Sequence, residues 1–289
     1  MTLVSTLSRR TENIDTGHLT IRRREIFLWV AVILLLNQLF YQIKQDWSAP
    51  PETLFYDLGA VGAFQLMAWC VIFGLLRASD PAPAARWRDL LVAAGLCLLL
   101  FLPTSRAIWA AAAGMAIYLL ISKNRDPQLR SAATVLAGLS VQQYWGHIFF
   151  NLVAFPLLRA EAAAVGTLLA MVRPGAAWQD NIVTGPNGFG VVVYSACSSF
   201  HNVSLAILCW LTVSRWRHQD QWRRDLVMLS VVAGTMIVLN LLRLCLMAWD
   251  KDLYDYWHTG QGADIFAIAA SVVIVSISLY GSQPTRQPR

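Results

Sequence analysis

The sequence predicts an all-α, polytopic membrane protein with about eight transmembrane helices, one interfacial or re-entrant helix and a small outer β-hairpin. The first observation is composition: 56% of the 289 residues are hydrophobic and only 14% are charged, against about 25% charged in a soluble domain. The second is that long uncharged runs recur along the chain, as membrane-spanning helices require. The third is the clustering of arginine in a few short loops, which is typical of the cytoplasmic side of a membrane protein.

Apolar runs between breaker residues define the predicted spans. The first run follows three arginines and has no small-residue cleavage site after it, so we expect a retained signal anchor instead of a cleaved signal. The net charge of +6 does not require nucleic acid as a partner, because topology explains the basic residues. The predicted spans are residues 26–43, 58–76, 89–103, 106–122, 131–152, 197–214, 225–248 and 262–280.

The distribution of Lys and Arg assigns each loop to a side of the membrane. Residues 157–172 are apolar but short for a span and contain Arg159 and Glu161. If this stretch does not cross, both tails (1–25 and 281–289) and the three Arg-rich loops share one side, which then holds 17 of the 23 Lys and Arg residues. We therefore expect cytoplasmic tails around a membrane domain of residues 26–280, embedded in a lipid bilayer, with 157–172 as an interfacial or re-entrant helix on the outer side.

The block 178–196 then lies on the outer side. Two β-prone runs within it flank Pro186-Asn187-Gly188, a strong hairpin signal. The hairpin would deliver the chain to Cys197 at the outer start of the sixth span. The sequence shows no other strand-like element.

Polar residues interrupt the membrane pattern at three places, and the predicted topology puts all three on the outer face. Cys197 is followed by two polar residues, Ser198 and Ser199, within "ACSSF". Asn240 and Arg243 lie three residues apart on one face of the seventh span, and a central arginine costs about 2.5–3.5 kcal/mol on insertion scales. The third place is the outer loop before the eighth span, which contains His258 followed by Gly260 and Gly262.

Together these residues supply a thiol nucleophile, a base and a fixed cation, the parts of acyl-transfer chemistry. At a helix N-terminus, Cys197 would meet unpaired N–H groups that favour the thiolate. Each residue also has a structural interpretation: helix packing for Cys197, snorkelling to head groups for Arg243 and an ordinary loop histidine for His258. The flanking serines could equally be helix caps.

Other titratable groups compete for the same roles. His201 is a rival base four residues after Cys197, and His147 in the fifth span is expected to be a hydrogen-bond partner within the bundle. Asp255 or Asp264 could orient the imidazole of His258, although Asp264 also suits a helix N-terminus. The five cysteines show no metal-like spacing, so we expect neither a metal nor a cofactor.

The motifs "ACSSF", "NLLR" and "HTGQG", in this order, resemble those of the exosortase/archaeosortase superfamily of polytopic cysteine transpeptidases. The family pattern has a cysteine in an "AC-S-G" context, an arginine in "N-x-x-R" and, in exosortases, a histidine followed by glycine. The matching residues are Cys197, Arg243, and His258 with Gly262. The resemblance covers the membrane core and is best over residues 130–280. Ser199 departs from the pattern because it stands where the family has glycine, and this could alter the substrate groove.

The resemblance implies a protease or transpeptidase of the bacterial cytoplasmic (inner) membrane, which acts through a thioester and has its active site on the periplasmic or outer side. Its partners would be exported proteins that end in a short motif, a transmembrane helix and a basic tail. Cys197 would attack the scissile carbonyl, Arg243 would stabilise the oxyanion or the thiolate, and His258 would protonate the leaving amine. Asn240 would orient Arg243 or donate to the oxyanion.

Two other classes of protein fit parts of the sequence. A non-enzymatic component of exopolysaccharide assembly or export would need no reactive thiol. A membrane acyltransferase or glycosyltransferase would be expected to show a His-Asp or acidic donor-binding motif inside the membrane, but the acidic cluster "WDKDLYDYW" falls in an outer loop. The sequence leaves open the recognition motif, the acceptor and the oligomeric state.

Overall fold

Helices make up most of the computed structural model, which describes residues 21–46, 62–80, 84–102, 104–122, 126–217 and 222–283. The predicted tails and the beginning of the second span therefore lie largely outside the described residues. Each of the eight predicted spans coincides, in its described part, with helix. The helices are α1 (Arg23–Asp46), α3 (Gly62–Ala78), α4 (Trp87–Leu100), α5 (Ser105–Ile121), α6 (Pro127–Ser140), α7 (Gly146–Val172), α8 (Ser199–Trp216), α9 (Trp222–Trp249), α10 (Lys251–His258) and α11 (Gln261–Gly281).

Eight transmembrane helices are not confirmed by length and composition. Among the described residues, four helical segments are long and apolar enough to cross a membrane: Arg23–Gln42, Pro127–Val172, Trp222–Trp249 and Gln261–Gly281. Helices α3 and α5 are apolar but shorter. The 14 residues of α4 form about 21 Å of helix, less than the hydrocarbon core of about 30 Å. The structure thus supports a multi-pass membrane protein with a smaller number of unambiguous spans.

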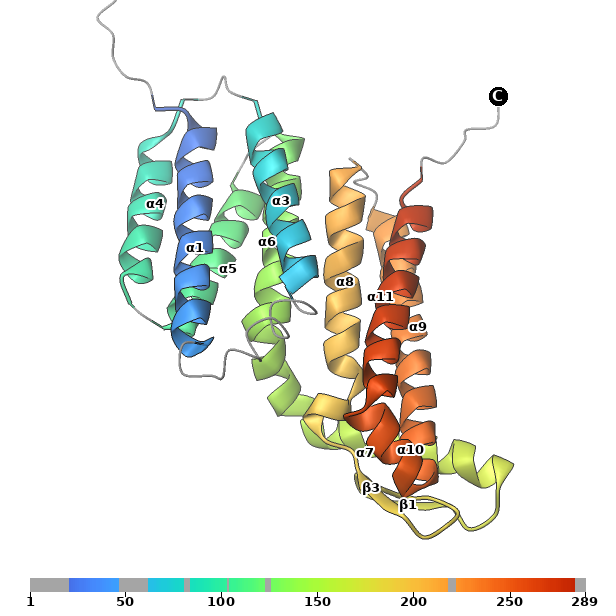
Figure 1. Ribbon diagram of the computed structural model, residues 1–289. Coiled ribbons are helices and arrows are strands. Elements are labelled where there is room, and N and C mark those ends of the chain that lie inside the picture. The colour runs from blue at the N-terminus through green and yellow to red at the C-terminus, as the bar shows by residue number, and fades with distance from the viewer. Residues whose placement is uncertain are drawn as a thin grey trace, which may run out of the picture.

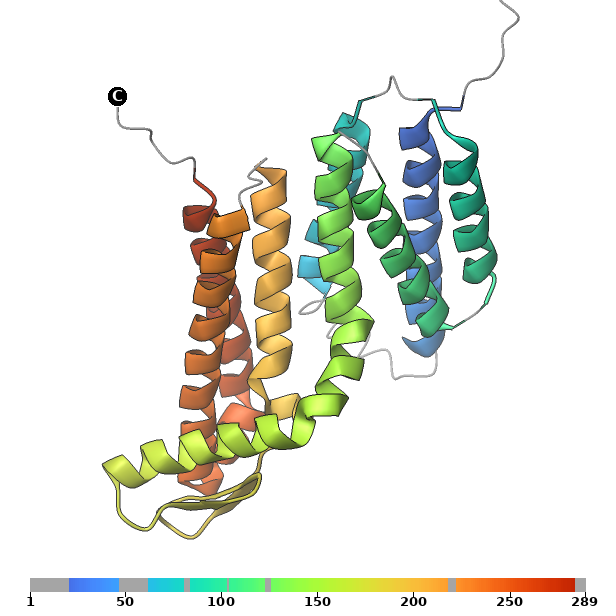
Figure 2. The ribbon, with the colours of Figure 1, turned by 180° about the vertical axis from the view of Figure 1, so that it is seen from behind.

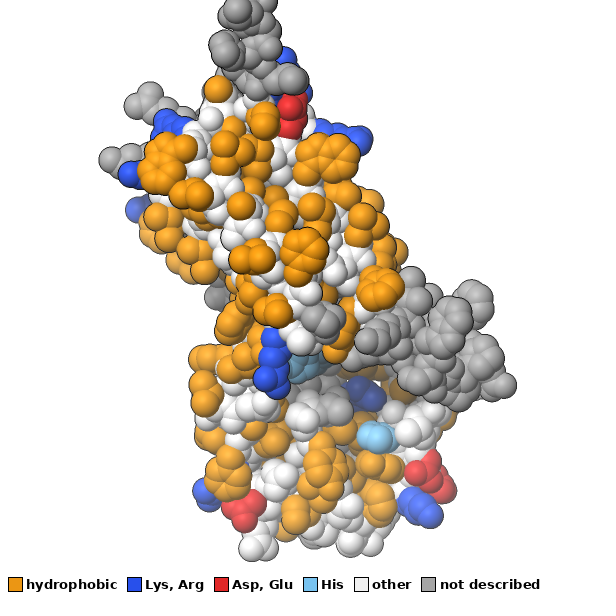
Figure 3. Space-filling model, turned by 90° about the vertical axis from the view of Figure 1, so that its left-hand side faces the viewer, with side chains coloured by type: hydrophobic (Ala, Val, Ile, Leu, Met, Phe, Trp, Pro, Cys, Tyr) orange, Lys and Arg blue, Asp and Glu red, His pale blue; other side chains and the backbone are white. Residues whose placement is uncertain are grey.

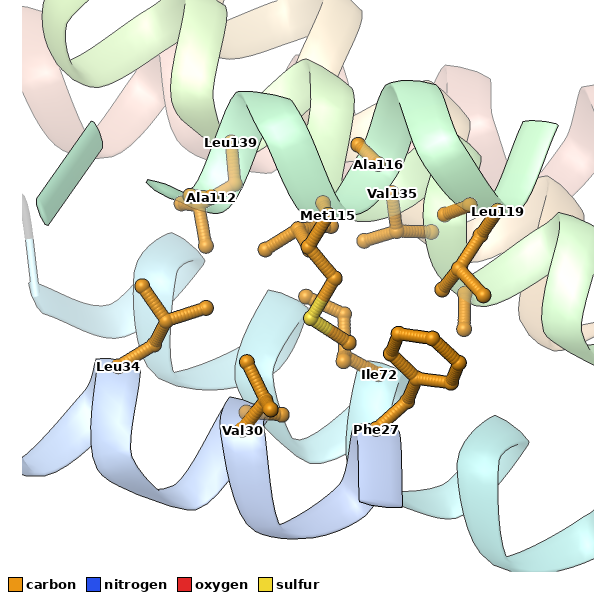
Figure 4. Packing of buried hydrophobic residues seen from close by; sticks show 14 of the residues in the cluster. Phe27, Val30, Leu34, Ile72, Ala112, Met115, Ala116, Leu119, Val135 and Leu139 are labelled. Carbon is orange, nitrogen blue, oxygen red and sulfur yellow. The ribbon is translucent and has the colours of Figure 1, made fainter. Parts of the chain in front are cut away.

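The helices form two groups that meet at α6 and α8 (Figure 1). In the first group, α1, α3, α5 and α6 surround a continuous apolar core, in which Met115 of α5 points between Phe27 and Val30 of α1 and Ile72 of α3 (Figure 4). In the second group, α8 packs against both α9 and α11, and its Trp210 is fully buried. The site described below lies at one end of this second group.

The two ends of the bundle differ in their connections. Helix α1 begins and α11 ends at the upper end in Figure 1, where α3, α5 and α8 also end and α4, α6 and α9 begin. In the sequence, these helix ends border the tails and the Arg-rich loops that the charge distribution grouped on one side. The strands, α10 and the second half of α7 gather at the opposite end.

The stretch 157–172, predicted to be a separate interfacial or re-entrant helix, is the continuation of the fifth predicted span. After α6, a π-helical turn (Val141–Trp145) leads directly into α7, which contains Pro156. A π-helical turn and an internal proline are both known causes of helix bending. The chain bends, and α7 runs across the lower end of the bundle (Figure 2). This path suits an interfacial helix and not a re-entrant one.

A small antiparallel sheet of order β1-β2-β3 follows α7. The strands are β1 (Ala177–Gln179), β2 (Ile182–Thr184) and β3 (Gly190–Val192). The predicted hairpin is confirmed, since β2 and β3 pair with Val183 opposite Val191. The first strand was missed because its three residues give no alternating pattern. A Cβ atom on Gly185 would lie 1.9 Å from the Ala248 carbonyl oxygen, so glycine there lets the hairpin pack on the end of α9.

Candidate active site

The surface changes character toward the lower end of the molecule. Figure 3 shows hydrophobic side chains covering the helical part, as expected of a surface that faces lipid, and a hollowed region below it in which His and Lys or Arg side chains are exposed. The predicted polar residues lie on the elements of this lower end: the 3-10 turn η2 (Ser195–Cys197) and helices α8, α9 and α10.

Cys197 lies ahead of α8 and not within it. It is the last residue of a 3-10 turn, η2 (Ser195–Cys197), and its N–H donates to the Tyr194 carbonyl at 2.9 Å. Ser198 is the N-cap of α8, and its hydroxyl accepts a hydrogen bond from the Phe200 N–H at 3.2 Å. The expectation that Cys197 occupies the helix N-terminus with unpaired N–H groups is therefore wrong. The cap interpretation of Ser198 is confirmed.

Asn240 fixes the turn that carries the cysteine. Its side chain is buried, and Nδ2 donates to the Cys197 carbonyl oxygen at 2.9 Å. Its Oδ1 accepts from Nδ2 of Asn202 in α8 at 3.5 Å. In the structure Asn240 thus contacts the backbone of Cys197, whereas we expected it to orient Arg243 or to face an oxyanion.

Arg243 lies one helical turn beyond Asn240 and is held by the following helix. Its Nε and Nη2 donate to the Trp257 carbonyl at 3.1 and 2.9 Å, near the C-terminal end of α10. The guanidinium carbon also lies 4.9 Å from the centre of the Phe266 ring, a cation–π contact. From this position Arg243 interacts electrostatically with Cys197. The structure therefore brings the predicted cation and the predicted nucleophile together.

His258 is the last residue of α10, a short helix where the sequence predicted a loop. Asp250 caps this helix by accepting the Leu253 N–H at 2.8 Å. The His258 ring stacks on Tyr254, with 4.8 Å between ring centroids and 12° between planes. Burial raises the pKa of the Tyr254 hydroxyl, and the nearby Cys197 raises it further. Tyr254 also packs against the apolar cluster that contains Cys197, so its ring lies beside both this cluster and His258. It was missed because reading 250–258 as a loop hid its i,i+4 relation to His258.

Gly262 lets α11 start directly against α10. A Cβ atom at this position would lie 2.6 Å from two ring carbons of Tyr256 and 2.9 Å from its carbonyl oxygen. Any larger residue would push α10, and with it His258, away from α11. The carboxylates proposed to orient His258 are both on exposed residues, Asp255 in α10 and Asp264 in the first turn of α11.

His201 does not have the expected helical relation to Cys197, because the cysteine precedes the helix. The structure places His201 in the first turn of α8, beside a cavity of about 360 Å³ that His147, Gln142 and Ser204 also line. His147 and His201 interact electrostatically. The two histidines thus form a pair between α7 and α8, separate from the contacts that surround the thiol.

Ser199, the residue that departs from the family pattern, contacts a buried carboxylate that the sequence analysis did not select. Its N–H donates to Oε1 of Glu161 at 2.9 Å, and its hydroxyl donates to the same oxygen. Glu161 lies in α7 and also interacts electrostatically with Cys197. The sequence signal for Glu161 was an acidic residue within the apolar stretch 157–172. We interpreted it only as evidence against a membrane span and not as part of a site.

Opposing effects act on the Cys197 thiol, which lies outside α8. Burial is the largest and raises its pKa, and the charge of Glu161 also raises it. A backbone hydrogen bond from Tyr194 and the charge of Arg243 lower it. The net pKa lies above the ordinary value of a cysteine, so the resting thiol is mostly protonated at neutral pH. Within the described residues, no group of three or more His, Cys, Asp or Glu side chains is placed to hold a metal ion.

Fold and site define a multi-pass helical membrane protein with a buried cysteine, an arginine and a histidine at one end of the bundle. The chain belongs to the transmembrane exosortase family (Exosortase_EpsH), whose sequence model matches residues 23–275. This membership supports a membrane transpeptidase or protein-sorting role in general. Comparisons with curated proteins and with solved structures found no significant match.

Proposed function

We propose that this exosortase is a cysteine protease or transpeptidase that cleaves the C-terminal sorting signals of exported proteins through a thioester intermediate. The observation that carries the proposal is the hydrogen bond from Asn240 to the Cys197 carbonyl, which holds the cysteine against α9 one helical turn from Arg243. The cysteine and the arginine come from segments more than 40 positions apart. Tyr254, stacked on His258, adds the proposed acid and base at the same end of the bundle.

The proposed reaction begins at the thiol. Cys197 loses its proton to His258, and its sulfur attacks the scissile carbonyl carbon to form a tetrahedral oxyanion. Arg243 stabilises the thiolate before attack or the oxyanion after it. As the C–N bond breaks, the leaving nitrogen takes the proton from His258, and the substrate remains on Cys197 as a thioester. His258 then accepts a proton from water or an acceptor nucleophile, which attacks the thioester carbonyl. The C–S bond breaks, the acyl group leaves on the acceptor, and His258 returns the proton to the Cys197 sulfur.

The arrangement of the bundle supports a defined orientation in the cytoplasmic membrane. The helix ends that border the Arg-rich loops lie at one end and the site at the other (Figure 1). By the positive-inside rule the Arg-rich end is cytoplasmic, which gives cytoplasmic tails and an outward-facing site. In this orientation, eight spans require the shorter helices α3, α4, α5 and α8 to cross as well. A substrate helix packed alongside the bundle would present its cleavage motif to Cys197 and keep its basic tail on the cytoplasmic side.

A cleavage assay with single-cysteine variants tests the proposal. The substrate is a protein from the same proteome that ends in a short motif, an apolar helix and a basic tail, coexpressed with the full-length exosortase. We expect cleavage with the wild type and none with Cys197→Ala. Cys209→Ala is the matched control, because Cys209 is also buried but lies within α8, and it should retain cleavage.

Two results would overturn this assignment. Cleavage that survives in Cys197→Ala would indicate another nucleophile, such as Ser198. The second result is a wild-type protein that cleaves no candidate substrate and whose Cys197 is not labelled by iodoacetamide, as measured by peptide mass spectrometry. This result would fit the alternative of a non-enzymatic component of exopolysaccharide assembly or export.

A further inference from the structure

Glu161 is a buried carboxyl group that the proposed reaction does not use. It lies in the part of α7 that runs across the end of the bundle, and only 5% of the residue is exposed. Its neighbours along the helix, Leu158, Ala162 and Val165, belong to the apolar cluster that also contains Cys197. A carboxyl group in such surroundings carries a desolvation cost that hydrogen bonds must offset.

The hydrogen bonds of Glu161 offset that cost only in part. Oε1 accepts both the N–H and the hydroxyl of Ser199, whereas the buried Oε2 has no hydrogen-bond partner within the described residues. Helix α8 already has Ser198 as its N-cap, so the carboxyl group is not needed for capping alone. A half-satisfied buried polar group in a native protein calls for an explanation, and a catalytic role is one of the recognised ones.

The position of Glu161 relative to the thiol suggests what that role is. Three ionisable side chains interact with Cys197, each from a different element: Glu161 from α7, Arg243 from α9 and Tyr254 from α10. Glu161 and Arg243 act on the thiol with opposite sign. The hydrogen bonds to Ser199, two residues after Cys197, also tie the carboxyl group to the backbone that carries the nucleophile.

We propose that Glu161 is a positioning residue for Cys197, which fixes the first turn of α8 through Ser199 and balances the charge of Arg243 at the thiol. The proposal rests on the proposed role of Cys197 as nucleophile. Ser199 is central to it, because the glycine of the family motif would supply the backbone N–H but not the hydroxyl. The departure at Ser199 is then explained as half of a Glu161–Ser199 pair that crosses from α7 to α8.

The test uses Glu161→Gln in the full-length protein, with two measurements. The amide keeps an oxygen for Ser199 but removes the negative charge, so the pH profile of Cys197 alkylation should move to lower pH. The rate of substrate cleavage at saturation should fall about tenfold, because small displacements of a nucleophile are costly. Glu25→Gln removes a charge on the exposed start of α1 and should change neither measurement.

Ser199→Gly provides a second variant that keeps the backbone N–H bond to Glu161. It should lower the cleavage rate by less than Glu161→Gln, and the double variant should lose less than the product of the two single effects, because the residues act as one pair. If Glu161→Gln fails to fold, Ser199→Gly decides the question by its own cleavage rate. A rate below wild type supports the proposal, and an unchanged rate overturns it. An unmoved alkylation profile would overturn the proposal, even with slower cleavage. The two proposals can fail separately. If cleavage is lost in Cys197→Ala but Glu161→Gln behaves like the wild type, Cys197 remains the nucleophile and only the role of Glu161 is overturned.

Discussion

The two ends of the bundle treat charge in opposite ways. At the end with the Arg-rich connections, buried charges are paired: Arg23 Nε lies 2.9 Å from Asp89, and Arg215 forms an ion pair with Asp225. Polar neighbours complete these pairs, since the Tyr118 hydroxyl donates to Asp89 at 2.8 Å and the Trp210 indole donates to Asp225 at 3.1 Å. At this end, each of these two buried carboxylates is therefore bound by an arginine and by a neutral hydrogen-bond donor.

At the other end, the half-buried Arg243 and the buried Glu161 differ from these ion pairs. Within the described residues, no carboxylate forms an ion pair with Arg243 and no cation forms one with Glu161. Instead, Arg243 donates hydrogen bonds to the Trp257 carbonyl, and Glu161 accepts one from the Ser199 N–H. Both side chains also interact electrostatically with Cys197. Paired charges stabilise a fold, whereas partly satisfied ones are expected at functional sites. The difference predicts that substitutions at one end change stability and that those at the other change activity.

The largest effect is expected from Arg243→Ala. If the guanidinium stabilises the thiolate or the oxyanion, its removal should reduce the cleavage rate about 100- to 1000-fold, the range for a lost oxyanion-stabilising donor. The midpoint of thermal unfolding should fall less than after the loss of a buried ion pair, because Arg243 forms no ion pair within the described residues. Arg243→Lys should remain impaired, because an ammonium does not present the same fork of donors to the Trp257 carbonyl. A rate near wild type would break the comparison between the two ends.

At the paired end, Asp225→Ala should act on stability. It removes the carboxylate that forms the buried ion pair with Arg215 and accepts the Trp210 indole N–H, which should cost about 3–5 kcal/mol of free energy of unfolding. The specific activity of the folded fraction should stay near wild type. Glu25→Ala removes an exposed pair with Arg22, at 3.9 Å, and should cost less than about 1 kcal/mol. Denaturant unfolding in detergent, combined with the cleavage assay, measures both quantities.

The sequence predicted the helices well because hydrophobic runs and arginine loops are local signals. It also predicted that Cys197, Arg243 and His258 would gather at one end, because topology alone assigns loops to sides. The bend of α7 was harder, since its continuity from the fifth span depends on tertiary packing across the end of the bundle. The number of spans could not be settled, because short helices such as α4 have no composition that distinguishes a span from a buried helix.

Within the site, sequence patterns identified the residue types but not their contacts. The role of Asn240 depends on a hydrogen bond to a carbonyl 43 positions away, which no spacing rule reveals. Glu161 and Tyr254 were missed for a related reason. One reaches the site through the bend of α7, and the other through a helix that was interpreted as a loop.

A moderate effect is expected from Gly262→Ala. The added methyl group would collide with the Tyr256 ring and carbonyl oxygen, so α10 must shift and carry Tyr254 and His258 with it. Because the thiol lies on η2 and not on α10, alkylation of Cys197 should change less than cleavage, which should fall about tenfold. Gly234→Ala in α9 is the control, since its Cβ would meet no atom within 4 Å. Equal activity of the two variants would show that the packing of α10 does not position the catalytic groups.

The smallest expected effect is a shift in the pH profile of Cys197 alkylation, which distinguishes the influence of Arg243 from that of Glu161. Arg243 lowers the pKa of Cys197 and Glu161 raises it, so Arg243→Gln should move the pH profile of alkylation to higher pH. Glu161→Gln should move the profile the other way. In each variant the thiolate forms once the pH exceeds the altered pKa, and the alkylation rate rises through that range. Rates measured by peptide mass spectrometry between about pH 6 and 10 would resolve both shifts. Shifts of the same sign would mean that burial alone, and not a balance of two unpaired charges, sets the reactivity of Cys197.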